Sequence, residues 1–172
     1  MDAIECLTNR RSIKSYKPDP VDEGVLKTII DAAMNAPTGM NRQSPIIIAV
    51  TNKSLRDRLS RLNAQVLGAD KDPFYGAPVV LVVLADRNVN THVYDGSLVM
   101  GNIMNAAYAL GLGSCWIHRA KEVFDSAEGK EILSSLGIEG DFEGIGHCVL
   151  GYADCPQPAK RDRKQNYVYY AK

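Results

Sequence analysis

Two short segments near opposite ends of the chain carry side chains that could bind an anion together. The first contains Arg10, Arg11 and Lys14 among serines, and the second is the run KRDRK at residues 160–164. Arginine binds phosphate through a planar fork of N–H groups, and serine hydroxyls add further donors. The chain has 20 acidic and 20 basic residues, so convergence of both segments on one phosphate would explain these local clusters of cations. The alternative is that each segment is a solvated loop, because short basic runs often match binding motifs by chance.

The signature motifs of several enzyme classes do not occur in the sequence. It contains no glycine-rich dinucleotide-binding motif, no P-loop, no G-x-S-x-G segment and no C-x-x-C pair. The three histidines lack the spacing of metal ligands; His118 is a candidate site residue, and His147 is interpreted as structural. A phosphate-bearing cofactor could therefore carry the chemistry without a nucleophile or general base from the protein. The polar loop at residues 37–45 offers further hydrogen-bonding side chains.

The hydrophobic pattern predicts interleaved helices and strands. Helices are expected over residues 2–9, 22–36, 54–67, 95–110, 123–127 and 130–136, and strands over 46–51, 78–85, 114–117 and 147–152. This alternation predicts one layered α/β-type domain in which helices cover a small sheet. The strands at 46–51 and 78–85 are continuous apolar runs, which is typical of strands buried on both faces.

The rest of the chain is organised around the stretch at residues 95–118, which opens with a helix at residues 95–110. Asp95 or Ser97 could cap its start, and Gly111 could end it. It is apolar on almost every side, which indicates burial all round. A chain of 172 residues has few places to bury a helix completely, so a partner subunit is expected to cover one face. The aromatic tail at residues 167–170 also needs a surface to pack against.

The overall composition limits the classes of partner and compartment. Hydrophobic residues make up 45% of the chain and charged residues 23%, as in ordinary globular domains. The balanced charge argues against nucleic acid or an anionic membrane as a partner. The first residues include no apolar signal-peptide segment. The scattered cysteines are expected to be reduced, as in a cytoplasmic protein.

Four segments, in order along the chain, resemble motifs of the FMN-dependent nitroreductase family. They are residues 10–16 (RRSIKSY), followed by Pro20-Val21; residues 36–43 (APTGMNRQ); residues 111–117 (GLGSCWI); and Gly151-Tyr152 with Pro158 and the basic run RDRK. The second is similar to the family's A-P-S/T-x-x-N-x-Q loop and the third to its G-L-G-S-C-W-I segment. They occur in the family's order and are spread over essentially the whole chain. At His118 the chain departs from the family pattern, which commonly has glycine there.

The resemblance implies both an architecture and an assembly. The fold expected is an α+β arrangement with a central mixed, mainly antiparallel sheet flanked by helices. The whole chain, residues 1–172, would form a single domain. Two copies would form a domain-swapped homodimer, in which the C-terminal tail, about residues 156–172, reaches over the partner subunit. An FMN would lie at each end of the dimer interface.

The resemblance also assigns cofactor-binding residues. Arg10, Arg11 and Ser12 would bind the phosphate and ribityl chain, Lys14 would approach the ring, and Arg161 and Arg163 would close on the phosphate. Pro37, Thr38 and Asn41 would reach the flavin of the partner subunit, with Gln43 beside them. Trp116, Ile117 and His118 would edge the isoalloxazine, where a backbone N–H should face N5. The run at 160–164 leaves open which of its cations contacts phosphate, because a shifted register is possible.

The activity implied is transfer of hydride from NADH or NADPH by a ping-pong mechanism to nitroaromatic, quinone or similar electron-poor acceptors. The flavin would carry the chemistry, so no catalytic side chain and no metal are expected. One alternative is another flavin reaction on the same scaffold, such as dehalogenation or flavin breakdown, or flavin binding without turnover. Another is a nucleic-acid-binding module. The physiological acceptor, the choice of NADH or NADPH and the role of His118-Arg119 are left open.

Overall fold

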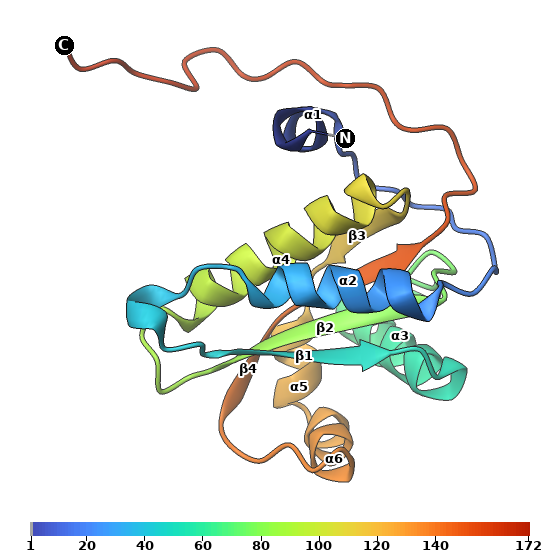
Figure 1. Cartoon of the computed structure of the whole chain (residues 1–172). Helices are drawn as coiled ribbons and strands as arrows, with labels where there is room; N and C mark the ends of the chain where they lie inside the picture. The colour runs from blue at the N-terminus through green and yellow to red at the C-terminus, as the bar shows by residue number, and fades with distance from the viewer. Residues whose placement is uncertain (1) are drawn as a thin grey trace.

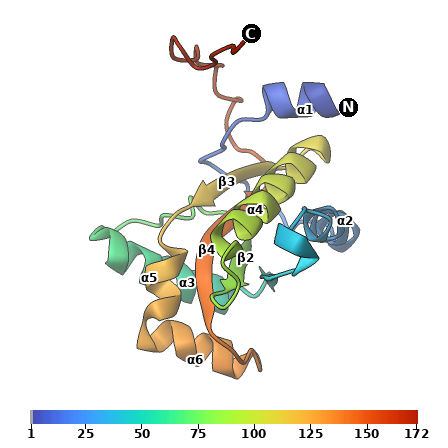
Figure 2. The same ribbon diagram turned by 90° about the vertical axis from the view of Figure 1, so that its left-hand side faces the viewer.

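A four-stranded sheet lies between two layers of helices in the computed structural model, which describes residues 2–172 (Figures 1 and 2). The elements are α1 (Ala3–Asn9), α2 (Glu23–Met34), the 3-10 turn η1 (Gly39–Asn41), β1 (Pro45–Val50), α3 (Lys53–Leu67), β2 (Val79–Asp86), α4 (His92–Ala109), β3 (Gly113–Ile117), α5 (Ala120–Asp125), α6 (Ala127–Ser135) and β4 (Phe142–Gly151). The predicted elements are all present, although β4 begins five residues earlier than expected.

The sheet has the strand order β1-β2-β4-β3, and every pair of neighbouring strands is antiparallel. The one parallel pairing found among residues 2–172 is the isolated bridge between Ser12 and Ser114. Even-numbered residues of β2 pack into a core with α3, α5 and α6, and odd-numbered residues pack into a second core with α2 and α4. This alternation follows from the two-residue period of a strand. The predicted helix-flanked, mainly antiparallel fold is confirmed.

Burial on both faces is confirmed for β2 and wrong for β1. All of β2 up to Ala85 is buried, whereas Ala49 of β1 is exposed and the first three residues of that strand are only half-buried. The difference arises because β1 is an edge strand, and an apolar run alone does not reveal sheet order. Its outer edge therefore presents unpaired backbone groups, which other proteins cover with another segment.

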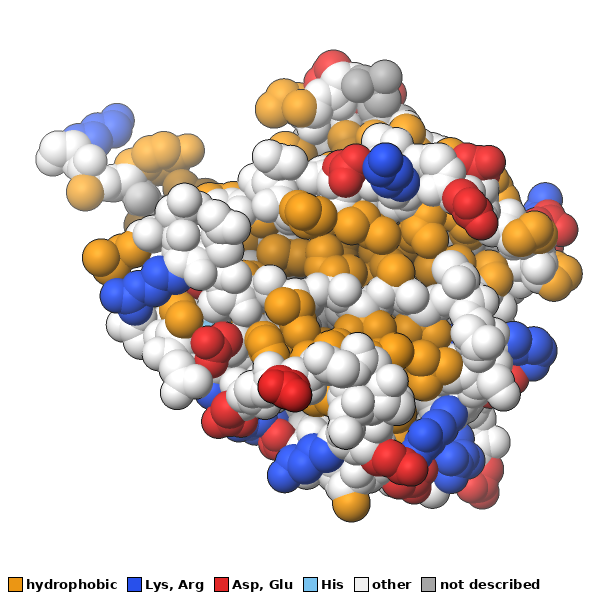
Figure 3. Space-filling model, turned by 60° about the horizontal axis from the view of Figure 1, so that its bottom comes forward, with side chains coloured by type: hydrophobic (Ala, Val, Ile, Leu, Met, Phe, Trp, Pro, Cys, Tyr) orange, Lys and Arg blue, Asp and Glu red, His pale blue; other side chains and the backbone are white. Residues whose placement is uncertain are grey.

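The capping prediction for α4 is wrong. The helix begins at His92 and its N-cap is Thr91, so Asp95 lies inside the first turn, where it is buried. Within a single chain α4 buries one face, through Val99, Ile103 and neighbouring residues, rather than all sides. Its other face leaves Leu98 and other large apolar side chains exposed. Figure 3 shows hydrophobic side chains gathered in a broad band on one face of the molecule.

The C-terminal tail extends away from the domain (Figure 1). Every residue from 156 to 172 is exposed, including the three tyrosines near the end. None of the helices described here combines the length and apolar character needed to cross a bilayer.

His147 lies in the core of the chain, between the rings of Phe74 and Phe124, whose centroids are 5.2 and 6.0 Å from the imidazole. Burial, together with the nearby Arg119 charge, lowers the pKa of His147 from 6.5 to about 3. The imidazole is therefore neutral in the folded protein at physiological pH. This placement fits the structural role expected for it.

The titration of His147 makes stability depend on pH. Its folded pKa lies below its unfolded pKa, so its contribution is complete above pH 6.5 and is lost as the pH falls toward 3. The free energy of unfolding should fall in that window by up to about 1.4 kcal/mol per pH unit. Urea titrations at several pH values should show that His147→Gln removes this slope. His118→Gln, at an exposed position, should retain it; identical slopes in all three proteins would contradict the assignment.

Candidate functional site

A cavity of about 630 Å³ lies where the two basic segments of the sequence meet. Its lining residues are Arg10, Arg11, Ser12, Lys14, Ser15, Cys155, Pro158, Ala159, Arg161 and Arg163. Five of these are cations and none is a carboxylate, so the cavity, called here the basic pocket, has the electrostatic character of an anion site. Of the cations at residues 160–164, Arg161 and Arg163 line the pocket and the two flanking lysines do not.

Backbone pairing explains why these distant segments meet. The N–H of Ile13 donates to the carbonyl of Ser114 on β3 at 3.0 Å. The next residues pair with the segment after β4, because Asp154 N–H donates to Ser15 at 2.9 Å and Tyr16 forms a bridge with Ala153. Ile13 and Tyr16 are buried and anchor the segment in the core, which leaves the basic side chains for the pocket.

The hydrogen bonding of the arginines shows whether the pocket fits an anion. The Nη1 atom of Arg10 is buried and has no hydrogen-bond partner among the described residues. Arg11, in contrast, donates from Nη1 to the carbonyls of Thr8 and Arg10. A buried guanidinium N–H without an acceptor is costly, and an oxyanion in the pocket would satisfy it. Lys14 lies over the ring of Tyr75, with its Nζ atom 5.9 Å from the ring centroid.

The residues expected at the ring of a flavin lie along the outer edge of β3. The carbonyl of Ser114 points to this edge because it accepts from Ile13, and the backbone of Trp116 points the same way by the alternation of a strand. The side chain of Trp116 packs toward α4, and Ile117 is buried on the opposite face. His118 is exposed. None of the three residues from Trp116 to His118 is among the lining of the basic pocket.

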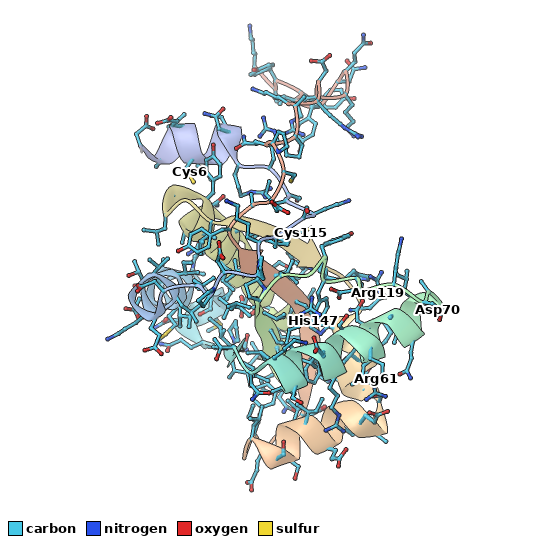
Figure 4. The ribbon with its side chains drawn as sticks, turned by 90° about the vertical axis from the view of Figure 1, so that its right-hand side faces the viewer. Cys6, Arg61, Asp70, Cys115, Arg119 and His147 are labelled. Atoms are coloured by element: carbon cyan, nitrogen blue, oxygen red, sulfur yellow. The ribbon has the colours of Figure 1, made fainter. Side chains whose placement is uncertain are left out.

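Asn63 on α3 holds the turn that follows β3, and sequence reasoning missed it. Its side chain is fully buried, donates to the carbonyl of His118 at 2.7 Å and accepts from Nε of Arg119 at 3.0 Å. Arg119 has a positive φ of 74°, which is unfavourable for a residue with a Cβ. Figure 4 shows Arg119 and His147 beside α3. The available signal was an amide next to the inward-facing Leu59 and Leu62 of this helix.

The polar loop lies away from the basic pocket. Pro37, Thr38, Asn41 and Gln43 line a second cavity of about 650 Å³, together with apolar residues of α2, β1 and α4. In Figure 1 this loop is at the opposite end of the sheet from the segment around residues 10–16. One chain therefore does not bring the loop residues and the arginines together. Residues 2–172 hold no cluster of three or more His, Cys, Asp or Glu side chains suited to a metal ion.

Sequence comparisons identify related proteins. The sequence model of the Nitroreductase family matches residues 7–71 and 64–152. A Bacillus subtilis protein named FMN reductase [NAD(P)H] is 30% identical over 181 aligned positions, which cover 95% of this chain and 69% of that protein. A Methanothermobacter thermautotrophicus relative, whose name includes NAD(P)H nitroreductase, is 33% identical over 121 positions. That alignment covers 67% of this chain but only 60% of the relative.

Solved structures show the same fold. A nitroreductase from Bacteroides fragilis, described with bound FMN, superposes with a TM-score of 0.91 over 100% of both chains at 23% identity. An FMN-dependent nitroreductase from Clostridium difficile has a TM-score of 0.82 at 27% identity, covering 98% of this chain and 99% of that one. Because the family model matches most of the chain and the resemblance of the motifs agrees with it, this chain belongs to the nitroreductase family.

Proposed function

We propose that this protein is an FMN-dependent oxidoreductase that takes hydride from NADH or NADPH and reduces nitroaromatic, quinone or similar electron-poor acceptors in a ping-pong cycle. The observation that supports it best is the basic pocket, where two ends of the chain bring together five cations, no carboxylate and a buried unpaired Arg10 donor. This donor set fits the phosphate of FMN. The names of the related proteins support the same cofactor and donor.

Each part of the chain has a distinct role in this proposal. Arg10, Arg11, Arg161 and Arg163 hold the phosphate, Ser12 contacts the ribityl chain, and Lys14 lies toward the ring. The free edge of β3 from Trp116 to His118 borders the ring and offers a backbone N–H to it. When bound, FMN supplies the hydride-accepting and electron-donating chemistry. The protein's contribution is to fix the cofactor and to keep one face open for stacking, so rate depends on positioning.

A homodimer completes the site in this proposal. The loop residues Pro37, Thr38, Asn41 and Gln43 lie too far along the sheet to serve their own basic pocket, so they would reach that of the partner subunit. Exposed apolar side chains on α1 and α4 would be buried between the subunits. The tail at residues 156–172 would lie over the partner, where the open edge of β1 offers backbone groups to pair with. A single domain over residues 1–172 and a cytoplasmic location stay predictions.

Other flavin reactions on this scaffold are an alternative. A structure described as oxidized iodotyrosine deiodinase bound to FMN and 3-iodo-L-tyrosine shares the fold, with a TM-score of 0.78 at 18% identity. At that identity the likeness shows the fold alone. Nitroaromatic or quinone reduction remains the proposal, and the deiodinase reaction should be measured alongside it.

The test of the proposed function is optical. Purified protein incubated with FMN and desalted should keep a flavin absorption band, which should bleach when NADH or NADPH is added under nitrogen. Adding a nitroaromatic or a quinone should then restore the band. A protein that releases FMN on desalting, or that binds FMN without bleaching, would contradict the proposal. Tight, salt-sensitive binding of an oligonucleotide in its place would favour the nucleic-acid alternative.

No thiol is expected to take part in the reaction. All four cysteines are free, and burial raises the pKa of the Cys115 thiol despite the nearby Ser12 and Lys14. Cys115→Ala should therefore leave the rate of flavin reduction by NADH or NADPH within a few-fold of the parent rate, as measured by anaerobic stopped-flow absorbance. A loss of several orders of magnitude with FMN still bound would show a thiol mechanism.

A further inference from the structure

Asp95, in the first turn of α4, is a buried carboxylate that contacts both the polar loop and Thr91, the N-cap residue of its own helix. Its side chain accepts hydrogen bonds from the N–H of Gly39 at 2.9 Å, from Oγ of Ser44 at 2.9 Å and from Oγ1 of Thr91 at 3.0 Å. Two of these donors, Gly39 and Ser44, stand on either side of the loop residues 40–43. The carboxylate therefore fastens both ends of the loop to one point.

The loop between these two ends has an unfavourable backbone. Met40, Asn41 and Gln43 all have positive φ values, between 51° and 53°, in the region that residues with a Cβ rarely adopt. Gly39 is needed for a different reason, since a Cβ there would lie 2.5 Å from Oγ1 of Thr91. Three strained residues within four positions persist only where surrounding contacts determine the conformation.

The electrostatics of Asp95 agree with this anchoring. Burial leaves the residue only 2% exposed and by itself raises the pKa of the carboxyl. The hydrogen bonds from Gly39, Ser44 and Thr91 outweigh burial and bring the pKa below its usual value. Asp95 is therefore ionised, and charge-assisted hydrogen bonds are stronger than neutral ones. Its position in the first turn of α4 also favours a negative charge.

We propose that Asp95 is a positioning residue, which holds the loop at residues 37–43 in the shape that it presents to the FMN site of the partner subunit. The contact with flavin rests on the proposed function. The anchoring of the loop rests on the hydrogen bonds of Asp95 alone. Within the anchored loop, the hydroxyl of Thr38 accepts from the N–H of Gln43 at 3.1 Å, and the side chain of Gln43 donates to that of Asn41 at 3.3 Å. The anchor thus orders the side chains that would contact the flavin.

Hydrogen exchange in cofactor-free protein tests the anchoring directly. Asp95→Ala should speed exchange of the Gly39 amide by about tenfold or more, because that amide loses its charged acceptor. Asp95→Asn keeps an acceptor for Gly39 and should restore much of the protection. Ser97→Ala is the matched control, since among residues 2–172 that hydroxyl on the same helix donates only to the carbonyl of Val93. Equal exchange in Asp95→Ala and the parent overturns the anchoring, whether or not flavin binds.

Affinities for FMN and riboflavin distinguish the contribution of the loop from that of the basic pocket. Asp95→Ala should weaken FMN and riboflavin by the same factor, about tenfold, because the loop lies away from the phosphate-binding arginines. Asp95→Asn should recover part of the affinity for both ligands. If Asp95→Ala binds both ligands like the parent, the loop does not depend on its anchor for binding. A parent protein that binds no flavin overturns the proposed function and the cofactor half of this inference, while the exchange result still decides the anchoring half.

A mixed dimer shows which subunit the loop serves. A dimer of one Asp95→Ala chain and one Arg10→Ala chain has an intact basic pocket on the first and an intact anchored loop on the second. If the loop serves the partner, these two intact parts form one complete site, and the mixed dimer should bind one FMN with parental affinity. If the loop serves its own chain, both sites of the mixed dimer stay weakened, and the proposal is overturned.

Discussion

Replacing Arg10 or Arg163 with alanine is expected to weaken FMN binding by roughly tenfold to a hundredfold. A hydrogen bond to a charged group contributes about 1.5–3 kcal/mol, and each 1.4 kcal/mol is about a factor of ten in affinity. Arg10 is the sharper of the two tests, because its Nη1 atom is buried without a partner in the described part of the chain. The Arg11 guanidinium already donates to two carbonyls. Arg11→Ala should therefore weaken FMN binding less than Arg10→Ala does. Fluorescence titration with FMN gives the dissociation constants.

Riboflavin, which lacks the phosphate, separates phosphate binding from folding. Riboflavin should bind poorly to the parent protein. Its affinity should hardly change in Arg10→Ala and Arg163→Ala. The double variant should lose less than the sum of the single losses if both side chains share phosphate oxygens. Arg61→Ala is a control, because this exposed arginine pairs with Glu128 on another face and should not affect FMN. If Arg163→Ala weakens riboflavin and FMN equally, the C-terminal arginines act through folding or assembly.

The helices and the central strands follow from local patterns. β2 could be predicted because seven apolar residues in a row leave no polar face, and α2 and α3 because their cap residues Asp22 and Asn52 precede amphipathic stretches. The edge position of β1 could not be predicted, because the order of strands in a sheet depends on pairings between residues far apart in the chain. The apolar sequence of β1 also looks the same as that of a strand buried on both faces.

The basic pocket could be predicted only in outline. The sequence places cations at both ends of the chain, but the register of the run at 160–164 depends on conformation. In an extended segment, residues two apart share a face, and this brings Arg161 and Arg163 together in the lining. The anchor at Asp95 could not be predicted, because its partners Gly39 and Ser44 are 56 and 51 residues away. Capping rules consider only the helix itself and therefore misassigned this carboxylate.

The pocket and the loop lie in different parts of one chain, so the proposed site depends on assembly. Ile103, on the inward face of α4, is 0% exposed and belongs to the core of one chain. Ile103→Asp would thus test folding, because an unpaired charge in the core is very costly. Leu98 is 48% exposed on the other face of α4, and it is the better test of a subunit interface.

Leu98→Asp is expected to dissociate the dimer and to strip its FMN while leaving the monomer folded. Burying an uncompensated charge in an apolar interface costs about 3–5 kcal/mol, which raises the dimer dissociation constant at least about a hundredfold. The monomer should stay folded because Leu98 contributes nothing to either core of the single chain. Sedimentation velocity at micromolar concentration gives the assembly state, and circular dichroism reports the fold.

Leu136→Asp is the matched control for this prediction. Leu136 is 45% exposed, almost as much as Leu98, but it follows α6 in the opposite helix layer. It should leave both the dimer and its FMN unchanged, which shows that an added charge by itself is harmless. A parent protein that sediments as a folded monomer and retains FMN would overturn the dimer and the shared site together. A dimer that survives Leu98→Asp would place the interface elsewhere, and loss of FMN from that dimer would point to a local contact of α4.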